Sequence, residues 1–175
     1  MLKAVIFDMD GVLIDSEPYH YAFETELHQK LGIQIPMNVR SSFVGLANQK
    51  MWSYIKDAYS LNQSVEELVQ WSIAERYLYF NNINNFKPIA GIIPLLEELK
   101  CNQIKTAVAS SSAPKIIELM LKRAEIHHYF SITVSGDDVQ QGKPAPDIFL
   151  ETTKKLNVKP DACIIIEDAY NGVTA

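Results

Sequence analysis

Residues 4–11 of this 175-residue chain read AVIFDMDG, an apolar run that ends in two carboxylates and a glycine. Four apolar residues without polar alternation are typical of a short strand that is covered on both faces of a parallel sheet. Asp8 and Asp10 repel each other and resist the loss of water, so placing both beyond a buried strand costs free energy. A hard cation would offset this cost, which makes phosphate chemistry the natural hypothesis for the site.

Further apolar runs predict a parallel sheet with helices between its strands. The strands are expected at Lys3–Phe7, Lys105–Ala109, Ser131–Val134 and Ala162–Ile166. Helices are expected at Ile92–Leu99, Pro114–Ala124 and Pro146–Leu156, the last two with proline in the first turn. This alternation predicts an α/β fold with a doubly wound, Rossmann-like parallel sheet.

The part of the chain between the first and second strands has a different pattern. Apolar and aromatic residues recur there at helical spacing, and the expected helices are Tyr19–Leu31, Gln49–Tyr59 and Ser64–Phe80. We therefore expect an α/β core formed by residues 1–16 and 87–175, with an all-helical insertion at residues 17–86. Sheets of this type usually continue beyond the helix expected after Asp168, so the C-terminal end at Ala175 is a candidate for truncation.

Composition favours an ordinary soluble globular protein, with 47% hydrophobic and 21% charged residues. The net charge of −5 and the absence of a Lys/Arg run argue against nucleic-acid binding. No stretch approaches the roughly 20 apolar residues that cross a bilayer, and the first apolar run is too short for a signal peptide. We expect a cytoplasmic protein with no membrane contact and no obligate protein partner. Cys101 and Cys163 are interpreted as reduced core thiols, although a disulfide between them stays open.

Polar residues follow each predicted strand, at the edge where open α/β sheets bind their ligands. They are Asp8 and Asp10, Ser110 to Ser112, Asp137 and Asp138 leading to Lys143, and Glu167 with Asp168. Asp8, Asp10 and Asp168 offer only oxygen ligands, which suit Mg²⁺ better than Zn²⁺. Lys143, the Ser110 hydroxyl and backbone N–H groups near Ser111 would hold phosphate oxygens.

Four segments resemble, in order, the four motifs of the haloacid dehalogenase superfamily, in the branch that holds β-phosphoglucomutase and many small-molecule phosphatases. The segments are residues 7–17 (FDMDGVLIDSE), 108–112 (VASSS), 142–149 (GKPAPDIF) and 165–173 (IIEDAYNGV). The resemblance spans nearly the whole chain. It implies that the helical insertion is a small cap that selects the substrate.

The resemblance also implies a role for each motif residue. Asp8 would attack phosphorus and form an aspartyl-phosphate, while Asp10 would act as general acid and then as general base. Ser110 and Lys143 would bind the transferring phosphoryl group, with Ser111 beside them. The implied Mg²⁺ site consists of Asp8, Asp168 and a backbone carbonyl of Met9 or Asp10, with Glu167 next to them.

Three further residues are implied as substrate contacts: His20 and Asn48 in the insertion, and Ser112 after the second strand. Members of the mutase branch carry an arginine in a Gly-x-x-Arg segment, where residues 45–48 of this chain read GLAN. The Asn48 amide cannot replace a bidentate guanidinium, although Arg40 or Lys50 could take its place. The missing arginine weakens the mutase interpretation.

The expected function is that of a Mg²⁺-dependent phosphatase acting on a small phosphorylated metabolite, with a sugar phosphate as the leading class. The alternatives are a β-phosphoglucomutase-like phosphotransferase and a non-catalytic binding protein that keeps the fold. A phosphonate hydrolase is a further option, which would need Lys50 or Lys56 as a Schiff-base lysine.

Overall fold

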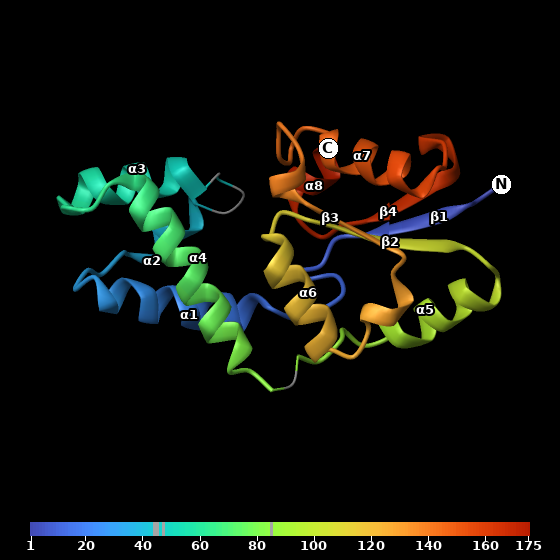
Figure 1. The fold of residues 1–175 in the computed structure, drawn as a ribbon, viewed down its shortest axis with the longest axis horizontal. Helices are drawn as coiled ribbons and strands as arrows, with labels where there is room; N and C mark the ends of the chain where they lie inside the picture. Colours follow the sequence, from blue (N-terminus) through green and yellow to red (C-terminus); the bar gives the residue numbers. More distant parts are fainter. Residues whose placement is uncertain (44–45, 47, 85) are drawn as a thin grey trace. The chain divides into compact units, whose positions relative to one another are not determined.

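The computed structural model describes residues 1–43, 46, 48–84 and 86–175. The chain divides into two compact units, Met1–Glu17 with Ile83–Ala175, and Pro18–Asn82. The elements of the first unit are β1 (Ala4–Phe7), α5 (Ile92–Cys101), β2 (Lys105–Ser110), α6 (Pro114–Arg123), β3 (Ile132–Ser135), α7 (Asp147–Leu156), β4 (Cys163–Ile166) and α8 (Tyr170–Thr174). The second unit holds most of α1 (Glu17–Lys30) and all of α2 (Met37–Ser41), α3 (Asn48–Tyr59) and α4 (Val65–Asn81) (Figure 1).

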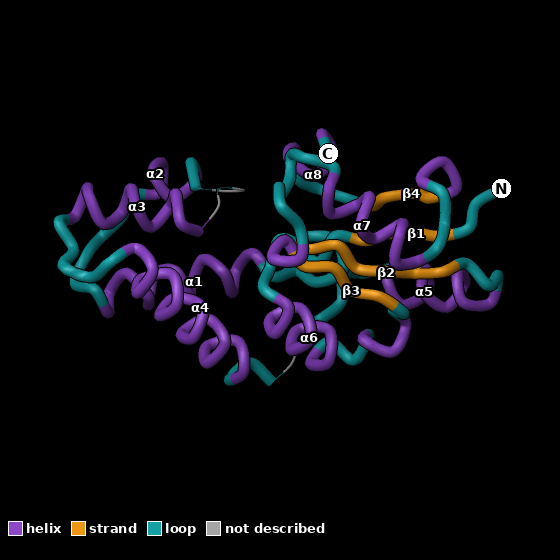
Figure 2. Tube along the Cα trace, turned by 45° about the horizontal axis from the view of Figure 1, so that its top comes forward, coloured by secondary structure: helices purple, strands orange, loops and turns teal. Residues whose placement is uncertain are grey.

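Within the described residues, the sheet has four parallel strands in the order β3-β2-β1-β4 (Figure 2). Ala4 of β1 is in register with Lys105 of β2 and with Cys163 of β4. Helices α5 and α6 lie on one face of the sheet, and α7 and α8 lie on the other (Figure 1). The predicted doubly wound α/β fold is confirmed, and the carboxyl ends of all four strands meet at one edge.

The core between the sheet and α7 explains why the strands read as continuous apolar runs. Alternate residues of β1 and β2 point to this face, and they pack against Ile148, Phe149 and Leu156 of α7. Strand β4 is also an apolar run, but within the described residues it is not covered on both faces, because Ile164 is 50% exposed and Ile165 is 41% exposed. Strand β4 lies at the edge of the described sheet and is paired with β1. An edge strand and a covered strand give the same apolar pattern.

The two cysteines correct a second expectation. Cys101, at the end of α5, is exposed, and Cys163, at the start of β4, is only partly buried. Both thiols are free. Interpreting them as core thiols was therefore wrong for Cys101, because the last residue of α5 falls outside the buried stripe of that helix.

The helical unit has an apolar core of its own, centred on Trp52. The Trp52 indole Nε1–H donates a hydrogen bond to the buried Ser72 hydroxyl across 3.0 Å, which links α3 to α4. Ser64 caps α4 in a capping box with Glu67. The short helix α2 was missed, because none of its five residues is buried and it has no apolar stripe to detect.

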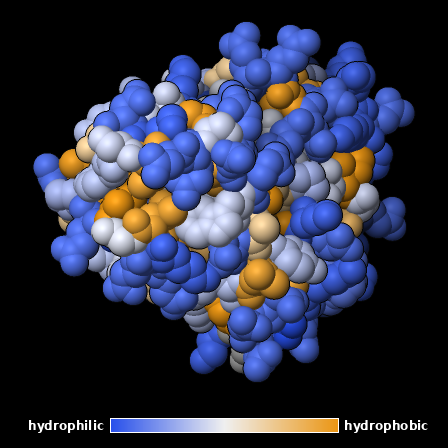
Figure 3. Space-filling model, turned by 60° about the vertical axis from the view of Figure 1, so that its left-hand side comes forward, coloured by the Kyte–Doolittle hydropathy of each residue, from blue (hydrophilic) through white to orange (hydrophobic). Residues whose placement is uncertain are grey.

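The surface shows no extended apolar belt on the face drawn in Figure 3, where hydrophobic areas are set among hydrophilic side chains. Among the described helices, none combines the length and apolar character that crossing a membrane requires.

A buried histidine makes the stability of the helical unit sensitive to acid. His28 is 4% exposed, and its Nδ1 has no hydrogen-bond partner among the described residues. Burial, followed by the charge of Arg40, lowers the pKa of His28 from 6.5 to about 4. Between these values the unfolded chain binds more protons than the folded one, so the free energy of unfolding should fall as the pH drops from 6.5 to about 4.

We predict that His28→Leu makes the unfolding midpoint less dependent on pH across this window than it is in the wild type. Urea unfolding followed by tryptophan fluorescence measures the effect, because both tryptophans of the chain, Trp52 and Trp71, lie in the helical unit. His128→Gln is the matched control, because His128 is exposed. An equal pH dependence in the wild type and in His28→Leu would contradict the assignment.

Candidate active site

The loop after β1 is folded back tightly by its own backbone. The Asp8 N–H donates to the Ile166 carbonyl of β4 across 3.0 Å, which continues the sheet by one residue. The N–H groups of Leu13 and Ile14 both donate to the Met9 carbonyl, at 2.9 and 3.1 Å. Gly11 supplies the positive φ of 79° that this turn requires. The loop therefore holds the acids of the first motif at the carboxyl edge of the sheet.

Lys143 joins segments that are far apart in the sequence. Its Nζ lies 2.6 Å from Asp8 Oδ1 and 2.6 Å from Glu167 Oε2, and it donates to the Ala109 carbonyl at 3.3 Å. The side chains of Lys143, Asp8 and Glu167 are 8%, 10% and 4% exposed. The ammonium also lies 5.1 Å from the centre of the Phe149 ring. One buried cation thus connects the ends of β1, β2 and β4.

The pKa of Asp8 lies above its ordinary value when no further cation is present. Burial raises the pKa of Asp8 from 3.8 to about 7, against the lowering effect of Lys143. The negative charges of Glu167 and Asp10 raise the pKa further. Additional positive charge beside Asp8 would restore the carboxylate that a nucleophile requires.

The carboxylates of Asp8, Glu167 and Asp168 form a group that fits a divalent cation. One oxygen of each lies within 4.8 Å of the others. The set contains only hard oxygen donors, which suits Mg²⁺ and does not suit a soft metal. The structure thus brings together three of the four acids predicted as metal ligands, while the side chain of the fourth, Asp10, has other partners.

Asp10 is held by hydroxyl groups. The Ser16 hydroxyl donates to Asp10 Oδ1 at 2.5 Å, and the Ser112 hydroxyl donates to Asp10 Oδ2 at 3.3 Å. Ser112 was predicted as a substrate contact, and this stays a prediction; in the structure its hydroxyl contacts a site acid. Ser16 was missed by the sequence analysis, although it lies inside the first motif. Ser16 is completely buried, which would have indicated a role in the site. The sequence did not predict this burial, because loop residues are usually exposed.

The serines after β2 differ in burial. Ser110 is 1% exposed, and its Oγ accepts a hydrogen bond from the Ser112 N–H at 3.1 Å. Ser111 is exposed in the following turn. The Ser112 carbonyl accepts from the Ser135 hydroxyl of β3 at 2.7 Å, which fixes this turn against the neighbouring strand. Binding of phosphate by Ser110 and Ser111 stays a prediction.

The two residues predicted as substrate contacts in the helical unit lie on different helices, His20 on α1 and Asn48 on α3. The His20 ring packs edge-on against Phe80, with ring centres 5.0 Å apart. Asn48 is exposed at the start of α3, and Gly45 and Ala47 of the same segment lie outside the described residues. Their contact with a substrate stays a prediction.

The cationic residues considered for this unit have different environments. Arg40 donates to the Ile35 carbonyl and the Thr25 hydroxyl, at 3.1 and 2.9 Å, and its guanidinium lies over the Tyr21 ring. Lys56, in the last turn of α3, donates to the Leu61 and Gln63 carbonyls of the following loop. Lys50 is exposed. Arg40 and Lys56 are thus engaged in structural contacts within the unit.

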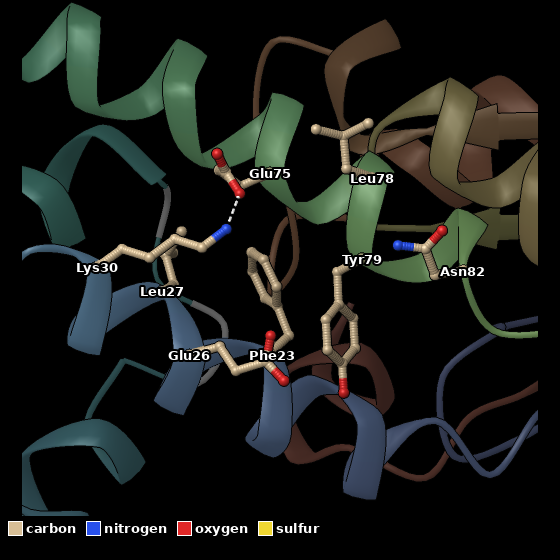
Figure 4. Close-up of a pocket in the computed structure, with 8 residues that line it drawn as sticks. All are labelled: Phe23, Glu26, Leu27, Lys30, Glu75, Leu78, Tyr79 and Asn82. Atoms are coloured by element: carbon tan, nitrogen blue, oxygen red, sulfur yellow. Dashed lines mark hydrogen bonds and ion pairs between the residues drawn. The ribbon is translucent and has the colours of Figure 1, made fainter.

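A hollow of about 260 Å³ lies between α1 and α4 of the helical unit (Figure 4). Phe23 and Leu27 form its apolar part, and the ion pair between Lys30 and Glu75 bridges the two helices at its side. None of the predicted site residues lines it.

Comparisons with known proteins agree with this geometry. The family model described as haloacid dehalogenase-like hydrolase matches residues 5–175. A phosphorylated carbohydrates phosphatase of Thermotoga maritima is 30% identical over 174 residues, which are 99% of this chain and 80% of that protein. A β-phosphoglucomutase of Bacillus subtilis is 32% identical over 181 residues, covering 99% of this chain and 78% of that protein.

A solved structure shares the fold as well. The crystal structure of a β-phosphoglucomutase from Clostridium difficile superposes with a TM-score of 0.82 at 30% identity, covering 99% of this chain and 79% of that one. The family match extends over all four motifs and over the whole sheet that carries the cluster around Lys143. The chain belongs to the haloacid dehalogenase-like hydrolase family.

Proposed function

We propose that the protein is a Mg²⁺-dependent phosphatase that hydrolyses a small phosphorylated metabolite, with sugar phosphates as the leading class. The observation that carries the proposal is the separate environment of two acids on one turn. Asp8 is paired with Lys143, whereas Asp10 is held by Ser16 and Ser112. Two carboxylates with different partners can serve as nucleophile and as acid–base group in one site.

In the proposed first step, an Asp8 oxygen attacks phosphorus and the bond from phosphorus to the leaving alcohol oxygen breaks. Lys143 lies 2.6 Å from Asp8, so a phosphoryl group on Asp8 would be within reach of its ammonium. Asp10 gives its proton to the leaving oxygen, which an alkoxide requires and a halide does not. In the second step, Asp10 takes a proton from the water that attacks phosphorus, and the bond between phosphorus and the Asp8 oxygen breaks, which releases inorganic phosphate and restores the Asp8 carboxylate.

The metal ligands in this proposal are the carboxylates of Asp8, Glu167 and Asp168, whose oxygens lie close together. A backbone carbonyl of Met9 or Asp10 is the further ligand that the family resemblance implies. When bound, a divalent cation supplies the positive charge that lets a carboxylate approach an anionic phosphate.

Phosphatase is preferred to mutase because a second phosphate lacks an evident clamp in the described part of the helical unit. Asn48 stands where the mutase branch has an arginine, and Arg40 already donates from Nε and Nη1 to Ile35 and Thr25. The similarity to a β-phosphoglucomutase of Bacillus subtilis keeps the mutase as the second candidate. Lys50, the other cation considered as a replacement for the arginine, is exposed.

Product analysis with glucose 1-phosphate and Mg²⁺ separates the two candidates. We predict release of inorganic phosphate, together with release from other sugar phosphates in a metabolite screen. Isomerisation to glucose 6-phosphate without phosphate release would favour the mutase. A lack of turnover across the whole screen would favour a non-catalytic binding protein and contradict the proposal.

We predict that Asp10→Asn slows both formation and hydrolysis of the phospho-enzyme, each by about 10²-fold or more, because an amide can neither donate nor accept the proton in question. Rapid-quench kinetics with a single turnover of substrate measures the two rates separately. Asp15→Asn is the matched control, because Asp15 is an exposed acid of the same loop. Asp10→Asn rates equal to those of the control would remove Asp10 from acid–base catalysis.

A further inference from the structure

We propose that Gly172 is a positioning residue for the active site, because its missing side chain provides the space in which the Glu167 carboxylate lies. A Cβ atom built on Gly172 would lie 2.0 Å from Glu167 Cδ and 2.1 Å from Glu167 Oε2. Both distances are far below any van der Waals contact. The carboxylate of Glu167 therefore occupies the position that any other residue at 172 would fill.

Each carboxylate oxygen of Glu167 accepts a hydrogen bond in this position. Oε2 accepts from the Lys143 ammonium at 2.6 Å, and Oε1 accepts from the Ala169 N–H at 3.1 Å. The Glu167 side chain is 4% exposed, and Gly172 is buried. The Glu167 side chain thus passes over the backbone of α8 at Gly172 to reach Lys143.

Backbone conformation gives no reason for a glycine at this position. Gly172 lies inside α8, and its φ is not among the positive values of the chain. Alanine is favoured over glycine in the interior of a helix. The space needed by Glu167 is the feature that accounts for the glycine.

Gly11 makes similar room for the neighbouring acid, since a Cβ there would lie 2.1 Å from Asp168 Oδ2. Gly11 also has a φ of 79°, so a substitution would strain the turn in addition to displacing the acid. Gly172 is therefore the position at which the effect on the acid can be tested alone.

The proposal makes a specific prediction for Gly172→Ala. The added methyl group meets the far end of a flexible side chain, so the Glu167 carboxylate should move and the fold should stay intact. Lys143 then loses one of its two carboxylate partners, and the acidic cluster loses one of its three members. The role of this cluster in catalysis rests on the proposed function, whereas the displacement of Glu167 does not.

Two measurements test the proposal separately from the proposed function. The first is the rate at which acetic anhydride acetylates Lys143, read by mass spectrometry. We expect this rate to rise several-fold in Gly172→Ala, because the amine is less shielded, and to match the rate in Glu167→Ala. The second is kcat/KM for phosphate release, which should fall in both variants. Val173→Ala, an exposed position on the same helix, is the matched control for both measurements.

The double variant is the deciding comparison. Gly172→Ala should have no further effect on either measurement when Glu167 is already alanine. If Gly172→Ala alone does not fold, folding of the double variant would still show that the conflict is with the Glu167 side chain. A wild-type acetylation rate in folded Gly172→Ala, or equal additional losses in the Glu167→Ala background, would overturn the proposal. A faster acetylation of Lys143 in Gly172→Ala, combined with a wild-type protein that releases no phosphate from any substrate, would support the positioning role of Gly172 and contradict the proposed function.

Discussion

The site depends on a single buried ammonium that two carboxylates share. Lys143 lies 2.6 Å from both Asp8 and Glu167, and all three side chains are at most 10% exposed. Burying charges is costly, and three acids, Asp8, Glu167 and Asp168, lie near this one lysine. Burial is the main cause of the raised pKa of Asp8, and the negative charges of Glu167 and Asp10 raise it further. The arrangement is thus suited to accept a further cation, which would both balance the acids and ionise the nucleophile.

The fold brings these groups together by simple means. In a parallel sheet all strands end at the same edge, so short loops after β1, β2 and β4 place their side chains in one region. Backbone hydrogen bonds to the Met9 carbonyl hold the first loop, and the Ser135 hydroxyl holds the second. Glycines at 11 and 172 leave room for the two consecutive acids after β4. The positions of Glu167 and Asp168 therefore depend on the absence of side chains at these two glycines as well as on the groups that bind the acids.

The sequence predicted the sheet, the helices and the meeting of Asp8 with Lys143 and the Glu167–Asp168 pair, because apolar runs and motif order carry that information. It could not predict that β4 is half exposed, since the apolar pattern records hydrophobicity and not the number of neighbours. It missed the hydroxyl partners of Asp10, because Ser16 and Ser112 are 96 positions apart and meet only in the fold. It missed the role of Gly172 in the same way, because the reason for that glycine is a side chain five positions away in a different element.

The identity of the nucleophile is tested most directly by a crystal structure of the protein with Mg²⁺ and beryllofluoride, which mimics a phosphoryl group on a carboxylate. We expect the beryllium to be bonded to an Asp8 oxygen, with a fluorine in hydrogen-bond distance of Lys143 and a cation bound by Asp8 and Asp168. Asp8→Asn crystals treated in the same way should lack the adduct. Beryllofluoride bonded to a different carboxylate, or bound with the cation remote from Asp168, would contradict the assignment of this site.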